Sequence, residues 1–238
     1  MHPPDSRSFS RVSRRELLKL TPVLAVGAFA LPSLQSALLN RGIQFSDWAA
    51  AGWFRNGHLA PTFPNSAVVP LSRFPLNSYI ADDPGVDLES WTLRVDGAVA
   101  RPGEYSLERM HGLPRVQQNT RHVCVEGWDV IGSFGGTRIS TVLADAGADT
   151  RARFLFFTCA DDYYESLDMA TALHPQSLLC DEMYGAPLAR EHGAPLRLIL
   201  PTKIGYKSAK YLTSVTVTNV LPRRGYWEDQ GYPWFAGL

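Results

Sequence analysis

Short apolar runs and apolar–polar alternation predict a fold built mainly from strands. Alternation with a period of two indicates a strand with one buried face, and a short continuous apolar run bounded by polar residues indicates a strand buried on both faces. The strands that these patterns predict are residues 91–95, 116–125, 154–157, 178–183, 196–200 and 215–218.

Capping and turn residues predict short helices and tight turns between these strands. We expect a turn at Asp96-Gly97, which would separate the first strand from its continuation. Short helices are expected over residues 105–112 and 141–146, the second with Ser140 as N-cap and Gly147 as its closing residue. The predicted fold class is therefore α+β, mostly β-structure with short helices.

The first 40 residues have the pattern of an export signal. Residues 13–19 read SRRELLK, which is the pattern of a bacterial twin-arginine signal. The apolar stretch that follows is interrupted by Pro22 and Pro32, and a stable membrane span needs roughly 20 continuous apolar residues. We therefore expect a periplasmic protein exported by the twin-arginine route, or a membrane-anchored one if the signal is not cleaved.

The rest of the chain divides into two expected parts. Residues 41–75 are rich in Trp, Phe, Pro and Gly without a steady period, which predicts an extended wrapping segment or a lid. Residues 76–238 are expected to form one catalytic domain. The twin-arginine route carries folded proteins, so the signal also predicts a cofactor that is bound before export.

Composition excludes several classes of protein. The 238 residues include 23 basic and 23 acidic side chains, so the formal net charge is zero. A nucleic-acid binder usually carries a basic stripe or patch, so we expect no nucleic-acid partner. The 45% of hydrophobic residues is enough for a sizeable core.

Cys124 is the first chemical candidate. It stands in the segment Arg121-His-Val-Cys-Val-Glu-Gly-Trp128, and cations from Arg121 or His122 would favour its thiolate form. A lone thiolate can hold a metal if a cofactor supplies the other ligands. The alternatives are a buried structural cysteine, or a disulfide with Cys159 or Cys180.

A second cluster combines glycine, serine and several cations. It runs from Glu191 through Arg197 and continues from Pro201 to Lys210. Backbone N–H groups near Gly and Ser, together with Lys and Arg, suit a phosphate group. The alternative is a basic loop on a solvated surface. The acidic and aromatic segment 161–165 is expected to be a solvated loop, and His174 a packed turn residue.

Three stretches together resemble the sulfite oxidase-like molybdopterin-dependent oxidoreductases. They are the Cys124 segment, His174-Pro-Gln-Ser-Leu-Leu179, and the pair His192-Gly-Ala-Pro-Leu-Arg197 and Gly205-Tyr-Lys-Ser-Ala-Lys210. Within this family the chain is most similar to the catalytic subunits of periplasmic methionine sulfoxide reductase systems. The resemblance spans roughly residues 72–227 and implies a sulfite oxidase-type molybdopterin-binding fold.

The resemblance also implies roles for individual residues. Cys124 would be the protein's thiolate ligand to molybdenum in a molybdenum-molybdopterin cofactor, and Arg121 a catalytic cation that polarises the substrate oxygen. The expected cofactor-binding residues are Asn77, Tyr79, Cys124, Cys159, His192, Arg197, Ser208, Ala209 and Lys210.

The activity implied is two-electron oxygen-atom transfer, in the direction of reducing an S-oxide or N-oxide such as methionine sulfoxide. A separate partner would exchange the electrons, either a haem-containing membrane subunit or a soluble cytochrome. The alternatives are sulfite oxidation by the same cofactor, which would need a strongly cationic pocket, a non-catalytic pterin-binding module, and a structural β-rich protein with a Cys124 disulfide.

Overall fold

A computed structural model of the chain describes residues 41, 45, 58–78 and 83–238. The chain divides into two compact units, Met1–Ser46 and Asp47–Leu238. In the first unit the described residues are Arg41 and Phe45, both helical and exposed. The predicted export signal and much of the predicted wrapping segment lie outside the described residues. The second unit carries the fold and the candidate site.

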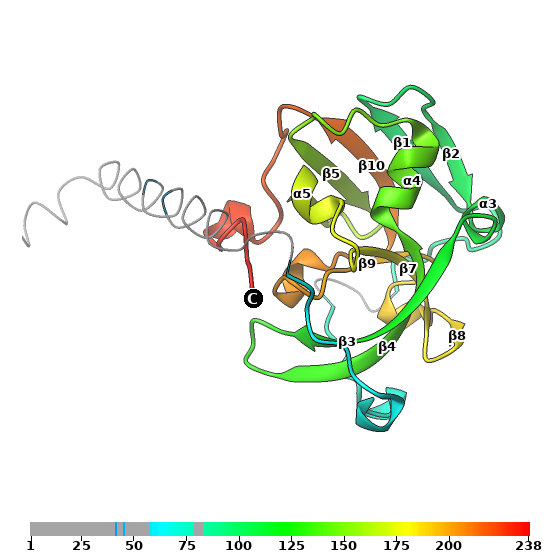
Figure 1. The fold of residues 1–238 in the computed structure, drawn as a ribbon, viewed down its shortest axis with the longest axis vertical. Coiled ribbons are helices and arrows are strands. Elements are labelled where there is room, and N and C mark those ends of the chain that lie inside the picture. The colour runs from blue at the N-terminus through cyan, green and yellow to red at the C-terminus, as the bar shows by residue number, and fades with distance from the viewer. Residues whose placement is uncertain (1–40, 42–44, 46–57, 79–82) are drawn as a thin grey trace, which may run out of the picture. The chain divides into compact units, whose positions relative to one another are not determined.

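One five-stranded sheet has the order β2-β1-β10-β5-β6, as Figure 1 shows. The strand β1 pairs in parallel with β10, and the other neighbours are antiparallel. Its strands are β1 (Thr92–Gly97), β2 (Gly103–Ser106), β5 (Phe154–Cys159), β6 (Tyr164–Asp168) and β10 (Leu212–Thr218).

The second sheet has the order β3-β4-β7-β8, with β9 also paired to β7. Its long β3–β4 hairpin extends away from the other sheet in Figure 1. Its strands are β3 (Arg115–Val123), β4 (Asp129–Arg138), β7 (Leu178–Met183), β8 (Ala186–Pro187) and β9 (Arg197–Ile199).

The helices are short, and capping side chains define two of their starts. The Ser106 hydroxyl accepts from the Arg109 N–H at 3.2 Å, and the Asp168 carboxylate accepts from the Thr171 N–H at 2.7 Å. The α-helices are α3 (Leu107–His111), α4 (Ile139–Ala146) and α5 (Met169–Ala172), and the 3₁₀ turns are η1 (Asn65–Ala67), η2 (Leu71–Arg73), η3 (Arg190–His192), η4 (Gly205–Lys207) and η5 (Glu228–Gln230).

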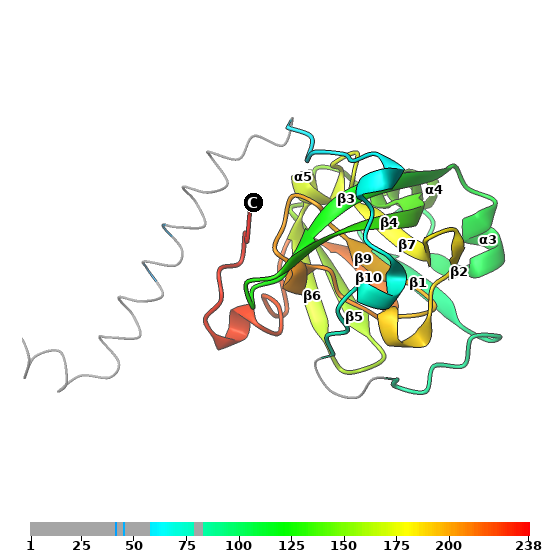
Figure 2. The same cartoon turned by 90° about the horizontal axis from the view of Figure 1, so that it is seen from below.

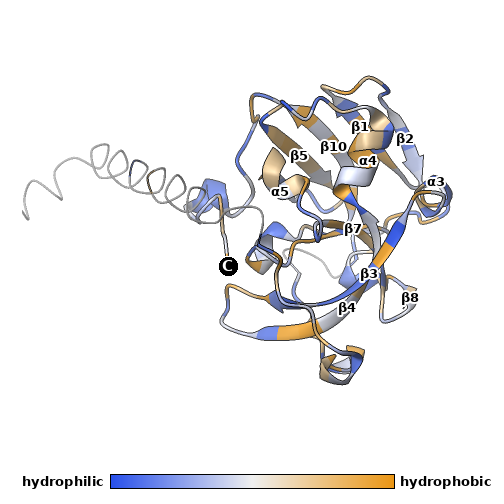
Figure 3. Cartoon of the chain, in the orientation of Figure 1, coloured by the Kyte–Doolittle hydropathy of each residue, from blue (hydrophilic) through white to orange (hydrophobic). Residues whose placement is uncertain are grey.

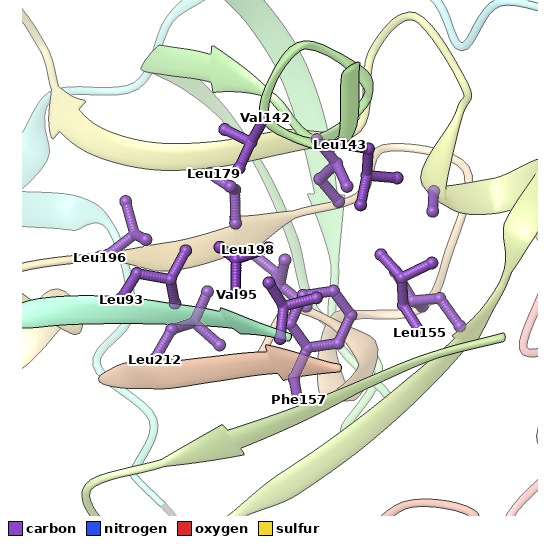
Figure 4. Close-up of a cluster of buried hydrophobic side chains, with 14 of the residues drawn as sticks. Leu93, Val95, Val142, Leu143, Leu155, Phe157, Leu179, Leu196, Leu198 and Leu212 are labelled. Atoms are coloured by element: carbon purple, nitrogen blue, oxygen red, sulfur yellow. The ribbon is translucent and has the colours of Figure 1, made fainter. Parts of the chain in front are cut away.

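The main core lies between the first sheet, α4, α5 and the inner faces of β7 and β9. Figure 4 shows its side chains, with Leu155 and Phe157 of β5 opposite Val142 and Leu143 of α4. Figure 3 shows hydrophobic colouring on β5 and α5, both of which contribute to this core. Burial of a large apolar side chain contributes about 1.5–3 kcal/mol, so this cluster is the main source of stability.

Successive side chains of β7 belong to two different hydrophobic clusters. Leu179 points into the main core, while Leu178 and Cys180 point into a second cluster that includes Phe74 and Phe134. The second cluster lies under the segment 58–78, which runs along β3 and β4 in Figure 2. Backbone bonds join Phe63 N–H to Asn119 O at 3.1 Å and Val69 N–H to Ile131 O at 3.0 Å.

The predicted strands are present, and the fold is mostly β-structure with short helices, as expected. The turn predicted at Asp96-Gly97 lies slightly later, because these are the last two residues of β1 and the chain bends at Ala98, after Gly97 with its φ of 86°. The predicted N-cap Ser140 is wrong, since α4 begins two residues earlier than predicted, at Ile139, and has Arg138 as its N-cap residue. Gly147 closes α4 as predicted, with a φ of 64° that favours glycine.

The strand β4 was not predicted, because its sequence contains three glycines, which are depleted in strands. Gly136 has a structural reason to be there. A Cβ atom at this position would lie 2.1 Å from the carbonyl oxygen of Leu179 on β7. The glycine therefore permits the close pairing of β4 with β7, next to an irregularity in their register.

The segment 161–165 is not the solvated loop expected from its charges. Asp161, Tyr163, Tyr164 and Glu165 are buried, and Tyr164 begins β6. His174 is a packed turn residue, as expected: it is 3% exposed, and its ring bonds the His58 carbonyl and the Gln176 N–H.

Candidate active site

Cys124 lies in the loop that joins β3 to β4. Its N–H donates to Trp128 O at 2.8 Å, and the Gly127 N–H donates to Cys124 O at 3.2 Å. Gly127 has a φ of 92°, which favours glycine at this turn. Cys124 is half-buried, so the hairpin holds the thiol at the edge of a cavity rather than in a core.

The Glu126 carboxylate connects the groups around Cys124. One of its oxygens accepts from Trp128 Nε1 at 2.9 Å and from Asn77 Nδ2 at 3.1 Å. The same oxygen and the Asn77 amide nitrogen each lie 3.7 Å from Cys124 Sγ. Asn77 is therefore placed beside Cys124, although 47 residues separate them.

A cavity of about 570 Å³ opens next to Cys124. Its volume is in the usual range for small-molecule and cofactor sites. Seven of the residues predicted for the site line it: Asn77, Cys124, His192, Arg197, Ser208, Ala209 and Lys210. The folding of the chain thus brings the Cys124 segment and the glycine-cation cluster to one place. Tyr79 lies outside the described residues.

Arg197 gives this cavity a buried positive charge. Its Nη1 donates to His192 O at 2.9 Å and its Nη2 to Ser208 O at 3.5 Å, while its buried Nε has no hydrogen-bond partner among the described residues. Burial lowers the pKa of its guanidinium. A buried cation without a carboxylate partner suits an anionic ligand. The alternative interpretation, a basic loop on a solvated surface, is therefore wrong for this part of the cluster.

Lys210 adds a second cation at the same end of the cavity. Its Nζ donates to Ser78 Oγ at 3.1 Å and to Glu191 O at 3.0 Å. Gly193, with a φ of 104°, allows the close approach of this side chain, since a Cβ there would lie 2.7 Å from Lys210 Cβ. The cavity thus combines two cations with the thiol of Cys124.

Two histidines line the cavity in their neutral form. Burial, with a smaller contribution from Arg197, lowers the pKa of His122 to about 3. Burial also lowers the pKa of His192, whose ring packs edge-on against Phe74 with centroids 5.4 Å apart. His122 therefore does not supply the cation expected beside Cys124. Burial raises the pKa of the Cys124 thiol in the absence of a metal.

Arg121 does not lie in this cavity, contrary to the sequence expectation. Successive side chains of a strand point to opposite faces, and Arg121 and Val123 line a second cavity of about 610 Å³. The Arg121 guanidinium pairs with the Asp129 carboxylate on the same hairpin. Its predicted catalytic role next to Cys124 has no geometric support.

Cys159 is also placed away from the cavity lining. It is buried in the main core on β5, and burial raises the pKa of its thiol well above the usual range. All three cysteines are free thiols, so the alternative of a Cys124 disulfide has no support. In the part of the chain that the structure describes, no group of three His, Cys, Asp or Glu side chains could hold a metal by itself. A metal at Cys124 would need ligands from a cofactor.

One wall of the cavity is aromatic and was not predicted from the sequence. It consists of Tyr163, Tyr206, Tyr226, Trp227 and Tyr232. The signal was the density of aromatic residues after residue 225, which could not be assigned to a site without the fold. Among the described helices, none has the length and apolar content to cross a membrane.

Comparisons with known proteins give matches over more than half of the chain. The model of the oxidoreductase molybdopterin binding domain matches residues 80–227. A putative protein-methionine-sulfoxide reductase subunit YedZ1 of Azospira oryzae is 45% identical over 207 residues, which cover 86% of this chain and 78% of that protein.

More distant relatives are named as protein-methionine-sulfoxide reductase catalytic subunit MsrP. The Pseudomonas syringae protein is 27% identical over 247 residues, covering 89% of this chain and 73% of that protein. The Xanthomonas campestris protein is 32% identical over 158 residues, covering 60% of this chain and 49% of that protein.

The fold also resembles the crystal structure of the sulfane dehydrogenase SoxCD from Paracoccus pantotrophus. The TM-score is 0.53 with 20% identity, over 57% of this chain and 40% of that chain. At this identity the likeness concerns the fold alone, and it confirms the sulfite oxidase-type fold expected from the sequence.

Proposed function

The chain belongs to the family of oxidoreductase molybdopterin-binding domains, and from this membership we propose that it reduces a sulfoxide at a molybdenum centre bound to Cys124. Methionine sulfoxide is the proposed substrate, because relatives carry that activity in their names. An N-oxide is the second substrate class. The observation that carries the proposal is that the Cys124 thiol and the buried Arg197 guanidinium line the same cavity.

The residues present fit a molybdopterin cofactor. The Cys124 thiol is a soft ligand of the kind that suits molybdenum. Arg197, with its unpartnered buried Nε, and Lys210 form an anion-binding end that suits the pterin phosphate. When bound, the cofactor supplies dithiolene sulfur ligands and a metal that exchanges an oxygen atom and two electrons.

The residues of the chain have defined parts in the reaction. Asn77 and Glu126 orient the Cys124 side chain through the contacts described above. Trp128, Tyr226 and Trp227 give the cavity apolar walls, which exclude water and suit the carbon substituents of a sulfoxide.

The overall reaction consumes a sulfoxide, two electrons and two protons, and releases a thioether and water. The electrons must come from outside the chain. The proposed donor is a haem-containing membrane subunit or a soluble cytochrome.

The charges near Cys124 favour a neutral substrate over sulfite. Glu126 places a carboxylate oxygen 3.7 Å from Cys124 Sγ, where it would repel a dianion. His122 is neutral, and Arg121 lies on the other face of β3. The strongly cationic pocket that sulfite oxidation would need is therefore not formed by the described residues around Cys124.

Export belongs to the same proposal. The segment SRRELLK at residues 13–19 supports export to the periplasm by the twin-arginine route. A variant in which Arg14 and Arg15 are both changed to Lys should accumulate in the cytoplasm, as measured by fractionation. Unchanged export of that variant would contradict this route.

The proposed activity is tested with protein produced in a molybdenum-replete bacterial host. We expect close to one molybdenum and one pterin per chain, and oxidation of a reduced viologen dye on addition of methionine sulfoxide. Cys124→Ala should lose the metal or change its spectrum, and should lose turnover. Metal-free wild-type protein would contradict the molybdenum site. Reduction of an oxidised cytochrome by sulfite, without turnover of sulfoxides, would favour the sulfite alternative.

A further inference from the structure

Three buried titratable side chains meet beside the cofactor cavity. They are Glu165 on β6, Lys207 in η4 and Glu228 in η5, each at most 1% exposed. Lys207 Nζ donates to Glu165 Oε1 at 2.6 Å, to Glu228 Oε1 at 2.5 Å and to the carbonyl oxygen of Ser166 at 2.8 Å. None of the three lines the cavity, so the proposed chemistry does not use them directly.

The cluster joins two walls of that cavity. Lys207 stands between Tyr206 and Ser208, which both line it. Glu228 follows Tyr226 and Trp227, which line it from another part of the chain. The ammonium group therefore links the part of the cavity around Ser208, which carries the anion-binding residues, to residues 223–235, called the C-terminal segment below.

The C-terminal segment also contacts the strand of Glu165 and the loop before Lys207, where Lys203 Nζ donates to Phe235 O at 2.9 Å and Tyr206 OH donates to Pro233 O at 2.7 Å. The Tyr226 N–H donates to Tyr164 O at 3.0 Å, and Trp234 Nε1 donates to Ser166 Oγ at 2.7 Å. Gly225 allows the approach, because a Cβ there would lie 2.1 Å from Glu228 Oε2 and 2.8 Å from Glu165 Oε1. The segment is thus docked on β6 and on residues 203–207, and the cluster joins these three parts of the chain.

Stability alone is a poor explanation of this arrangement. Apolar side chains of similar volume often stabilise a protein as well as a buried ion pair does. Here one oxygen of each carboxyl group, Glu165 Oε2 and Glu228 Oε2, is buried without a hydrogen-bond partner among the described residues, which has a further energetic cost. What the cluster does provide is a directional contact that fixes Lys207, and with it the adjacent Ser208, relative to the C-terminal segment.

We propose that Glu165, Lys207 and Glu228 are positioning residues that couple cofactor binding to docking of the C-terminal segment. Loss of the cluster loosens both walls, and the cofactor is then released more easily. Because thermodynamic coupling is reciprocal, a bound cofactor keeps the segment docked by the same factor. The inference rests on the molybdopterin cofactor and holds for any reaction that this cofactor carries out.

The experiment compares wild type with Lys207→Met and Glu228→Gln. Each protein is prepared once with cofactor and once without it, the second time from a host that lacks molybdopterin synthesis. Pterin content is followed during dialysis by the fluorescence of the oxidised pterin. Hydrogen exchange is measured for residues 223–235. We expect wild-type cofactor to slow exchange in the segment. Lys207→Met, which leaves two buried carboxylates, should release pterin about tenfold faster or more and should abolish that slowing.

Glu228→Gln keeps the shape of the side chain and one oxygen that can accept from Lys207 Nζ, so this variant should fold. Its pterin release and segment exchange should change in the same direction as in Lys207→Met, but by less. It keeps the test decisive if Lys207→Met fails to fold. The matched control is Asp181→Asn, which breaks a buried ion pair with Arg115 away from the cavity. It should lower the melting temperature without changing pterin release or the effect of the cofactor on exchange.

Two outcomes would overturn the inference. One is pterin release and segment exchange that stay at wild-type values in Glu228→Gln and in folded Lys207→Met. The other is an equal effect of Asp181→Asn on pterin release and segment exchange, which would show that the cluster acts only through the overall stability of the protein. Failure of the proposed function is separate, since it would show as pterin-loaded wild type without sulfoxide turnover.

Discussion

Arg121 and His122 are adjacent on β3 and line different cavities. The period of two along a strand sends Arg121 to the side of Val123, while His122 shares the side of Cys124. The cation closest in sequence to Cys124 is thus excluded from its cavity. The positive charge there comes from Arg197 and Lys210, which are 73 and 86 positions further along the chain.

This separation predicts opposite results for two arginine substitutions. Arg197→Met should lower cofactor affinity by roughly tenfold to a hundredfold, since a hydrogen bond to a charged group contributes about 1.5–3 kcal/mol. Arg121→Met should change it little, because an exposed ion pair contributes about 0–1 kcal/mol. Molybdenum and pterin content after purification measure both effects. Equal losses in the two variants would contradict the assignment of the anion-binding end.

The three cysteines should differ in reactivity. Cys124 is half-buried, whereas Cys159 and Cys180 are buried with thiol pKa values raised by burial, that of Cys180 to about 12. Because the thiolate is the reactive form, iodoacetamide should modify Cys124 first in cofactor-free protein. Bound cofactor should protect it. Peptide mass spectrometry gives the order of modification, and faster labelling of Cys159 would argue against the described burial.

Glu165 should make stability depend on pH. Burial, and to a lesser extent the Glu228 carboxylate, raise the pKa of Glu165 well above its ordinary value, with Lys207 opposing the rise. The stability that this group contributes is fully present below the ordinary glutamate pKa, and it is lost as pH rises through the raised value. Glu165 should therefore lower the melting temperature of wild type as pH rises above the ordinary glutamate pKa.

Glu165→Gln removes the titrating group and should give a flatter dependence over the same range. A Glu165→Gln curve parallel to that of wild type would show that the pH dependence has another source.

Two glycine substitutions should differ in their effect on folding. In Gly136→Ala the new methyl group would meet the backbone oxygen of Leu179, which cannot move aside without breaking the pairing of β4 with β7, and we expect a cost of about 3 kcal/mol. Gly185 has a φ of 75° and open space around it, so Gly185→Ala should cost only about 1 kcal/mol. Thermal unfolding compares them, and equal melting temperatures would contradict this difference.

Local patterns predicted much of the fold and part of the site. Strands such as 215–218 alternate clearly, and Gly147 ends α4 where expected. The grouping of Cys124 with Arg197 and Lys210 came from the resemblance to a family, since no local signal joins residues so far apart. The placement of Arg121 outside the Cys124 cavity could have been predicted from the sequence. Arg121 and Cys124 are three positions apart, and an odd separation along a strand puts two side chains on different faces.

The buried cluster could not be predicted from the sequence. An acidic and aromatic segment usually belongs to the surface, and Glu165 is buried only because Lys207, 42 positions away, and Glu228 complete its surroundings. The strand β4 was missed for a similar reason, since its glycines are explained by the approach of β7 and not by their neighbours in sequence.

The parallel pairing of β1 with β10 has a consequence for how the protein is made. β10 lies between β1 and β5 in the first sheet, and it is the last strand of the described chain. Its contacts with β1, such as Arg94 with Ser214, close a large loop, which makes folding slow. A ribosome that has synthesised β1, β2, β5 and β6 has therefore released four strands of a sheet whose centre is still missing, and these strands must avoid aggregation until residues 212–218 emerge.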